Sequence, residues 1–356
     1  MKRVLVHLLV AVSILAAGLS EFRVAAAPVL PGLSVSGAQI VANGLPVRLR
    51  GMNMGDPFWA RNTGWYHILT MKDYASLARS WHANVVRIFI FPTQWKHKTH
   101  AQVLKSLGRQ VNAALSHGMY VIISYQVIGW PDGYYQKRDG GNPKDQYDSS
   151  FALATSFWDR VSLKYGSDTR IIFDLWNEPV NAADRTVPPS TPNPVWPSLK
   201  VYYDSLIQTV RNNGAQNILL VTGNYHAGWL VGIKDDPIAD PNVAYAFHRF
   251  SVPDRNTPAV WDEATGGLIG VKPVIVSAWG YEDKDIRHPT WPGTSADFCT
   301  PFTQWMESNQ LSNLAYIYHY SWKPALLKSN GRPTLFGKCV KSYISAANTA
   351  GTLAIP

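Results

Sequence analysis

The sequence is poor in cysteine, in clustered charge and in long apolar runs. Two cysteines among 356 residues exclude a small domain that depends on many disulfides. Charged residues make up 16%, and the lysines and arginines behind the net charge of +9 are scattered along the chain. No basic helix with interleaved aromatic residues is present, so nucleic acid and membrane surfaces are not indicated as partners.

The one long apolar run lies at the start of the chain. Residues 1–3 are basic at two positions, residues 4–19 are largely apolar, and small residues follow at 24–27. This order is typical of a secretory signal peptide. The alternative is an uncleaved membrane anchor, but the run is shorter than the roughly 20 residues that a span needs. We therefore predict a signal peptide over residues 1–27, a single domain over 28–356, and an extracellular or periplasmic protein that leaves the membrane after cleavage.

The two cysteines, Cys299 and Cys339, have no cluster of histidines near them in the sequence. In an exported chain, a pair of cysteines predicts one disulfide, and two free buried thiols are the alternative. A metal site is not indicated because the usual ligand spacing is missing. Nothing in the sequence calls for a metal or an organic cofactor.

Short apolar runs alternate with amphipathic segments along the chain. The runs are continuously apolar, as expected for parallel strands whose two faces are both buried. Eight such units predict a (β/α)₈ barrel, preceded by a hairpin that turns at Asn43-Gly44 and closes the bottom. A doubly wound open sheet is the alternative, but residues 51–55 lack the glycine-rich phosphate fingerprint. The predicted strands are 47–51, 84–91, 120–125, 170–176, 218–222, 243–248, 273–277 and 314–320.

A carboxylate follows the fourth predicted strand, in the tetrapeptide Trp176-Asn177-Glu178-Pro179. A side chain just past a barrel strand points into the mouth of the barrel. Apolar walls there raise the pKa of a carboxyl group towards that of a general acid. The alternative is a glutamate that merely begins a loop, with the proline in its first turn.

These residues resemble glycoside hydrolase family 5, the cellulase family of retaining (β/α)₈ glycosidases, from about residue 35 to the C-terminus. In that family the Asn-Glu-Pro follows the fourth strand, which makes Glu178 the acid/base and Asn177 a ligand of the sugar 2-hydroxyl. Arg87 matches an arginine that supports the nucleophile, His248 a histidine of the sixth strand, and Trp322 the sugar platform. The resemblance implies a β-linked polysaccharide, a glucan or a mannan, as substrate and a monomeric protein.

The chain departs from the family at three positions. The family has its nucleophilic glutamate at the end of the seventh strand, where this chain has Ala278, followed by Trp279. Phe250 occupies the position of a tyrosine that bonds the nucleophile, and Gln126 stands near a position that is often histidine. A methyl group can neither attack an anomeric carbon nor carry the sugar as an ester. The chain as written should therefore not hydrolyse its substrate by the retaining mechanism.

The sequence allows three explanations for Ala278. The glutamate was replaced by design, or the protein has lost catalysis and keeps its cleft for binding, which Phe250 favours. In the third explanation Glu282 or Asp283 takes over as the base of an inverting enzyme; otherwise both are solvated loop charges. Among the tryptophans near strand ends, Trp279 is predicted as an additional sugar platform because it adjoins Ala278.

Overall fold

The structure is a computed structural model, and it describes residues 30–58, 70–133, 145–180, 195–283 and 286–349. The predicted signal peptide, residues 1–27, lies outside the described residues. Within the described part, no helix is both long and apolar enough to cross a membrane.

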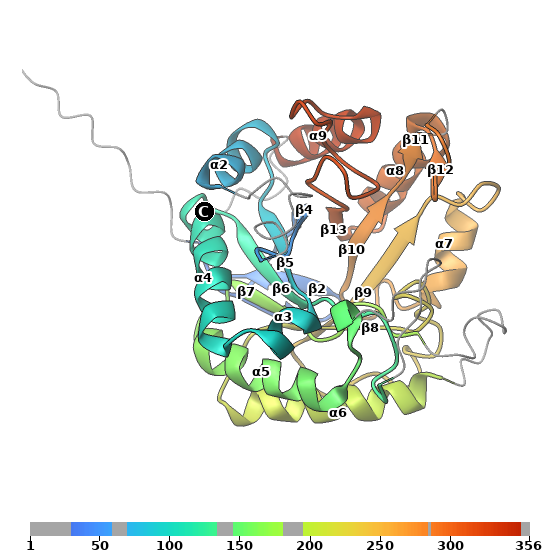
Figure 1. Cartoon of the computed structure of the whole chain (residues 1–356). Coiled ribbons are helices and arrows are strands. Elements are labelled where there is room, and N and C mark those ends of the chain that lie inside the picture. Colours follow the sequence, from blue (N-terminus) through green and yellow to red (C-terminus); the bar gives the residue numbers. More distant parts are fainter. Residues whose placement is uncertain (1–29, 59–69, 134–144, 181–194, 284–285, 350–356) are drawn as a thin grey trace, which may run out of the picture.

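Eight parallel strands close into a barrel, which confirms the predicted fold (Figure 1). Around the barrel the order is β10-β13-β4-β5-β6-β7-β8-β9. Because the strands are parallel, their carboxyl ends meet at one rim. The strands are β4 (Arg50–Gly55), β5 (Val85–Ile90), β6 (Tyr120–Tyr125), β7 (Ile171–Asp174), β8 (Leu219–Thr222), β9 (Val243–Phe250), β10 (Val274–Gly280) and β13 (Ser312–Ala315).

Helices surround the barrel strands, as Figure 1 shows. Alternate strand residues pack outward against these helices or inward into the barrel. On β5, for example, Val86 and Ile88 belong to the outer core and Val85 to the inner one. The helices are α2 (Met71–Ser80), α3 (Pro92–His97), α4 (His100–Ser116), α5 (Phe151–Tyr165), α6 (Trp196–Asn212), α7 (Pro258–Thr265), α8 (Thr300–Ser308) and α9 (Leu335–Thr349), with short turns at η1 (Asp145–Tyr147) and η3 (Ser295–Cys299).

A small antiparallel sheet closes the bottom of the barrel. It consists of β1 (Leu33–Ser36), β2 (Gln39–Ala42) and β3 (Leu45–Pro46), and the predicted turn at Asn43-Gly44 joins the last two. Leu33 and Ile40 pack against the inward-facing barrel residues. The amino-terminal end of the barrel is thus filled by apolar side chains, which leaves the opposite rim for a site.

Two predicted strands differ most from the structure in their bounds. The run 47–51 was expected as a strand, but β4 begins at Arg50 because Val47 still bonds to the hairpin through the Ile40 carbonyl. The run 314–320 was also expected as a strand, but β13 ends at Ala315. Beyond it the chain leaves the ladder, since the Ile317 N–H donates to the carbonyl of Pro324 in the following loop.

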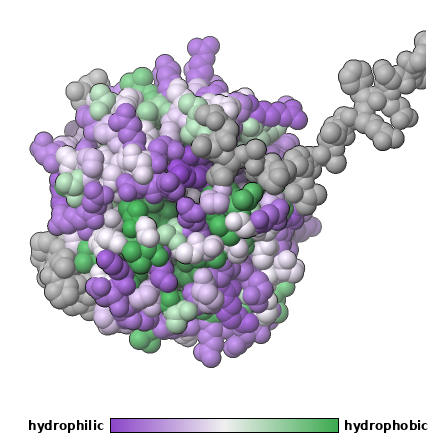
Figure 2. All heavy atoms as spheres, turned by 180° about the vertical axis from the view of Figure 1, so that it is seen from behind, coloured by the Kyte–Doolittle hydropathy of each residue, from purple (hydrophilic) through white to green (hydrophobic). Residues whose placement is uncertain are grey.

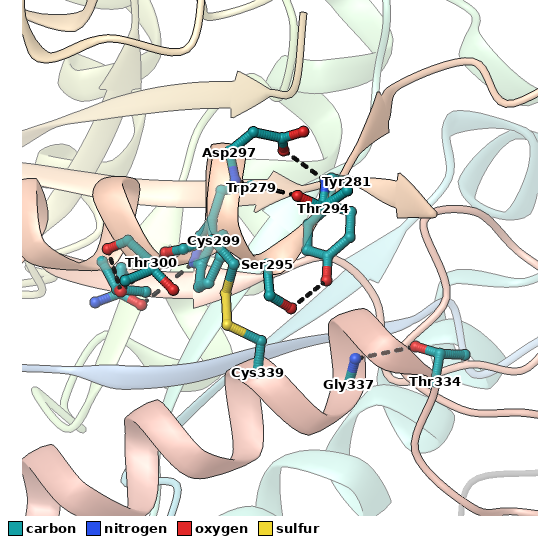
Figure 3. The surroundings of a disulfide bond; sticks show 12 residues. Trp279, Tyr281, Thr294, Ser295, Asp297, Cys299, Thr300, Thr334, Gly337 and Cys339 are labelled. Carbon is teal, nitrogen blue, oxygen red and sulfur yellow. Dashed lines mark hydrogen bonds between the residues drawn. A yellow bond between two sulfur atoms is a disulfide. The ribbon is translucent and has the colours of Figure 1, made fainter. Parts of the chain in front are cut away.

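The predicted disulfide joins Cys299 to Cys339 (Figure 3). It ties η3, at the start of α8, to α9 across a sequence separation of 40 residues. Nearby, the Tyr281 and Ser295 hydroxyls share a hydrogen bond of 2.8 Å. The bridge therefore fastens the last two helices of the outer layer to each other.

The surface view shows mainly hydrophilic side chains, with hydrophobic ones gathered towards the middle of the face drawn (Figure 2). Several large apolar side chains are exposed, but they belong to separate elements. Leu45 lies on β3, Leu163 on α5 and Val201 on α6. Single exposed apolar residues of this kind are normal in folded proteins and indicate no partner.

Candidate functional site

A cavity of about 380 Å³ opens at the carboxyl rim of the barrel. Its wall is built from the ends of β9 and β10 and from loops that follow other barrel strands. Most of the residues predicted from the sequence meet there. These are Gln126, Asn177, Glu178, His248, Phe250, Ala278 and Trp322.

Glu178 is held at the rim by its own backbone. Its N–H donates to the Val127 carbonyl at 3.1 Å, and its carbonyl accepts from the Gly129 N–H at 3.1 Å. Its carboxylate contacts two histidines: His248 Nδ1 lies 3.0 Å from Oε1, and His226 Nδ1 lies 3.3 Å from Oε2. Among the described residues that line the cavity, Glu178 is the only one with a carboxylate.

The two histidines give Glu178 a lowered pKa, whereas the sequence predicts a raised one. Burial alone would raise the pKa of this carboxyl group, but the hydrogen bonds and charge of His226 and His248 lower it well below its ordinary value. The expectation of a raised pKa is therefore wrong, because the apolar walls are outweighed by the two partners. Glu178 is held as a carboxylate that accepts hydrogen bonds.

His248 links Glu178 to the inside of the barrel. Burial lowers the pKa of His248, although the Glu178 carboxylate acts against this. Its Nε2 lies 2.9 Å from the hydroxyl of Ser277, which is fully buried. A neutral ring satisfies both contacts when Nδ1–H donates to Glu178 and Nε2 accepts from the Ser277 hydroxyl.

His226 reaches Glu178 from an unusual turn after β8. Tyr225, His226 and Ala227 are consecutive residues with φ of 54°, 56° and 59°, the left-handed region. Each costs roughly 1–2 kcal/mol for a residue with a Cβ. The His226 N–H donates to the Pro179 carbonyl and the Ala227 carbonyl accepts from the His248 N–H, so the turn joins the loop beyond β7 to strand β9. Such strain is typical of functional sites.

Removing the His226 imidazole should raise the pKa of Glu178. In His226→Gln the carboxylate loses the charge of one partner while its burial remains, so its titration should move to higher pH. The whole chain has only five glutamates, Glu21, Glu178, Glu263, Glu282 and Glu307, so the side-chain carboxyl resonances of glutamate-labelled protein can be followed singly by ¹³C NMR. Glu178→Gln assigns the resonance. His117→Gln, outside the cavity, should leave its midpoint unchanged, and an equal shift in both variants would contradict the prediction.

Arg87 does not line the cavity but lies fully buried beneath it. Its Nε donates to Asp174 at 2.8 Å, and its Nη2 donates to the Asn177 side-chain oxygen at 2.7 Å. The remaining contacts are with Asn53 and Ser124. Arg87 is predicted from the family resemblance to support the nucleophile and to bind sugar; in the structure it does not line the cavity, and it holds the side chain of Asn177.

Ala278 faces the cavity in aromatic surroundings. It belongs to a buried cluster with Phe89, Tyr316 and Ile317, against which Phe250 and Trp322 pack. The ring of Tyr316 stacks on Phe89 at 6.0 Å and meets the edge of Phe250 at 5.8 Å. Ala278 is therefore surrounded mainly by aromatic side chains.

Trp279 does not contact the cavity, which corrects its prediction as a sugar platform. It is fully buried, its indole N–H donates to Asn313, and its ring packs on Phe302 and Phe336 of the outer helices. Alternation along β10 explains this, because the residue after an inward-facing Ala278 faces outward. Trp291, which stacks on Phe250 at 4.7 Å, lines the cavity instead.

Glu282 and Asp283 are not on the cavity wall either. They form β11 (Glu282–Asp283), which pairs with β12 (Pro292–Gly293). Glu282 is buried, pairs with Lys323 at 2.9 Å, and accepts from the Thr290 N–H at 2.7 Å. The explanation in which one of them acts as an alternative base is therefore not supported, since Glu282 holds the loop that carries Trp291.

Comparison with known proteins assigns most of the chain to a family. The sequence model for cellulase, glycosyl hydrolase family 5, matches residues 40–324. Cellulase CelDZ1 of a Thermoanaerobacterium species is 24% identical over 77% of this chain and 66% of its own length. Endoglucanase C of Evansella cellulosilytica is 23% identical over 77% of this chain but only 34% of its own length. The chain thus spans about one third to two thirds of these relatives.

A solved structure shares the fold over most of both chains. The β-glucanase SdGluc5_26A of Saccharophagus degradans, crystallised with cellotetraose, superposes with a TM-score of 0.78 and 24% identity. The match covers 90% of this chain and 94% of that one. It supports the same barrel architecture.

Proposed function

Because the chain belongs to the cellulase family, glycosyl hydrolase family 5, we propose that its cavity binds a β-linked glucan and holds it without retaining hydrolysis. One observation supports this proposal: Ala278, at the position where the family resemblance leads us to expect the nucleophilic glutamate, lines the cavity. The cavity keeps the groups that would hold a sugar and lacks a second carboxylate among its described residues. The protein is then a binding relative of glycosidases.

The chemistry of the site agrees with the loss of catalysis. Retaining glycosidases use two carboxyl groups about 5–5.5 Å apart, one as acid and one as nucleophile. Here the methyl group of Ala278 cannot attack the anomeric carbon. Loss of the nucleophile alone costs about 10⁴-fold or more in comparable covalent enzymes.

The cavity offers what sugar binding requires. Trp322 and the Phe250–Trp291 pair present aromatic rings, and a pyranose ring has apolar faces that pack against such surfaces. Asn177 and Gln126 add amide groups for hydroxyls. A glucan is preferred over a mannan because the similar proteins are named cellulase, endoglucanase and β-glucanase. Secretion after cleavage of residues 1–27 and a monomeric state are part of the same proposal.

Calorimetry with cellotetraose tests the proposal. The mature protein should bind cellotetraose more tightly than mannotetraose and release no reducing sugar during prolonged incubation with β-glucan. Trp322→Ala should weaken binding roughly tenfold, since about 1.4 kcal/mol is a factor of ten. Leu163→Ala on α5 removes an exposed apolar side chain outside the cavity and is the control. Rapid hydrolysis by the parent, or equal binding by both variants, would overturn it.

A further inference from the structure

One wall of the cavity has a chemical character that neutral sugar does not explain. It lies where β9 leads into α7 and is lined by Arg249, Val252, Arg255, Val260 and Ala264; we call it the α7 wall. It belongs to the same cavity as Glu178 and Ala278. A ligand seated beside Glu178 can therefore extend towards it.

Arg249 is the distinctive residue of the α7 wall. Its Nη2 donates to the backbone carbonyl of Arg255 at 2.8 Å, whereas its Nε is buried and has no hydrogen-bond partner. Burial, together with the charge of Arg255, lowers the pKa of Arg249 to about 10. Two guanidinium groups are thus placed near each other without a carboxylate from the described part of the chain.

Other arginines of this protein differ from Arg249 in having carboxylate partners. Those that are buried or half-buried elsewhere in the described ranges form ion pairs with carboxylates. The pairs are Arg48–Glu307, Arg50–Glu307, Arg87–Asp174, Arg170–Asp168 and Arg211–Asp240. A partly buried arginine without such a partner costs stability, because its charge loses water without gaining a counter-charge. The missing counter-charge at Arg249 points to a ligand.

The surrounding groups do not supply that counter-charge. Glu178 is occupied by His226 and His248, and Lys323 on the cavity wall brings another positive charge that is paired with Glu282. The planar fork of a guanidinium matches the two oxygens of a carboxylate and binds them in a bidentate manner.

We infer that the α7 wall is an anion-binding subsite and that the preferred ligand is a β-linked oligosaccharide carrying a carboxylate, as in a uronic acid residue. Arg249 and Arg255 bind the carboxylate, and the aromatic part of the cavity holds the neutral sugars. This rests on the proposed function, because it names the substrate class of the same cavity. A sulfate ester offers similar oxygens, so the test must separate the two groups.

The experiment compares ligands that share one backbone. Cellotetraose, a tetramer oxidised to carboxylate at C6, and a sulfated tetramer are titrated into the mature protein by calorimetry. The oxidised tetramer should bind at least about tenfold more tightly than cellotetraose in dilute buffer, with a smaller advantage at 0.5 M salt because exposed charges are screened. A gain confined to the sulfated tetramer would overturn the carboxylate assignment.

Variants of single arginines show which side chains give the oxidised tetramer its higher affinity. Arg249→Gln should abolish the advantage of the oxidised tetramer while cellotetraose still binds, and the exposed Arg255→Gln should reduce it. Arg160→Gln on α5, whose side chain is 59% exposed and lies outside the cavity, should retain it. If Arg249→Gln does not fold, the inference is tested with Arg255→Gln alone, and an unchanged advantage of the oxidised tetramer in that variant overturns it. Equal affinity for neutral and oxidised tetramers overturns this inference alone, whereas binding of neither overturns the proposed function as well.

Discussion

Ala278→Glu combined with Phe250→Tyr should turn the chain into a β-glucan hydrolase at least about 10⁴-fold faster than the parent. The double variant supplies a nucleophile and a hydroxyl that can donate to it. The strand register supports this expectation, because Ala278 pairs with His248 and Gly280 pairs with Phe250 on the adjacent strand. The two substituted side chains therefore project from neighbouring strands at the same rim.

The single variant Ala278→Glu should hydrolyse β-glucan much more slowly than the double variant. A carboxylate at this position would stand beside Phe89, Phe250 and Ile317, and burial among apolar side chains favours its neutral, unreactive form. The Arg87 guanidinium beneath is already engaged with its own partners. The Phe250→Tyr hydroxyl is therefore expected to restore the nucleophile by hydrogen bonding to it.

Reducing-sugar release from mixed-linkage β-glucan measures the effect, with mannan and xylan alongside. Ala278→Gln/Phe250→Tyr is the matched control, because it has the same shape without a nucleophile and should stay inactive. Adding Glu178→Gln to the active variant should abolish its hydrolysis. If Ala278→Glu alone is as active as the double variant, the chain is an enzyme that lacks only its nucleophile, and the proposed adaptation to binding is wrong.

Arg87→Met should destabilise the protein by about 3–5 kcal/mol, since it leaves Asp174 as an uncompensated buried charge. Both side chains of this pair are fully buried. Asn177 would also lose the donor that holds its side-chain oxygen, so cellotetraose should bind more weakly. Arg87→Met/Asp174→Leu removes both charges and should recover part of the stability.

Urea denaturation with the disulfide intact measures these differences. Arg170→Met is the control, because its pair with Asp168 is partly exposed, at 31% and 26%, and exposed pairs contribute only about 0–1 kcal/mol. If Arg87→Met lowers the free energy of unfolding no more than Arg170→Met does, the buried Arg87–Asp174 pair does not stabilise the barrel. Weaker binding without lower stability would instead make Arg87 only a positioning residue for Asn177.

Local pattern was sufficient to predict the barrel and the position of its site. Eight apolar runs separated by amphipathic segments indicate parallel strands, and such strands bring their carboxyl ends to one rim. Residues after different strands, such as Gln126, Asn177 and Trp322, therefore had to lie near one another. The outward direction of Trp279 was also available from strand alternation, which the prediction from its neighbour Ala278 overlooked.

The ionisation of Glu178, the burial of Glu282 and the isolation of Arg249 were decided only by the tertiary structure. Each depends on partners that are distant in sequence: His226 and His248 at Glu178, Lys323 at Glu282, and the missing carboxylate beside Arg249. A pKa or an ion pair depends on distance and burial, which sequence patterns do not encode. The sequence by itself determined the barrel and the rim that carries the site, and only the tertiary structure decided which charged groups meet at that rim.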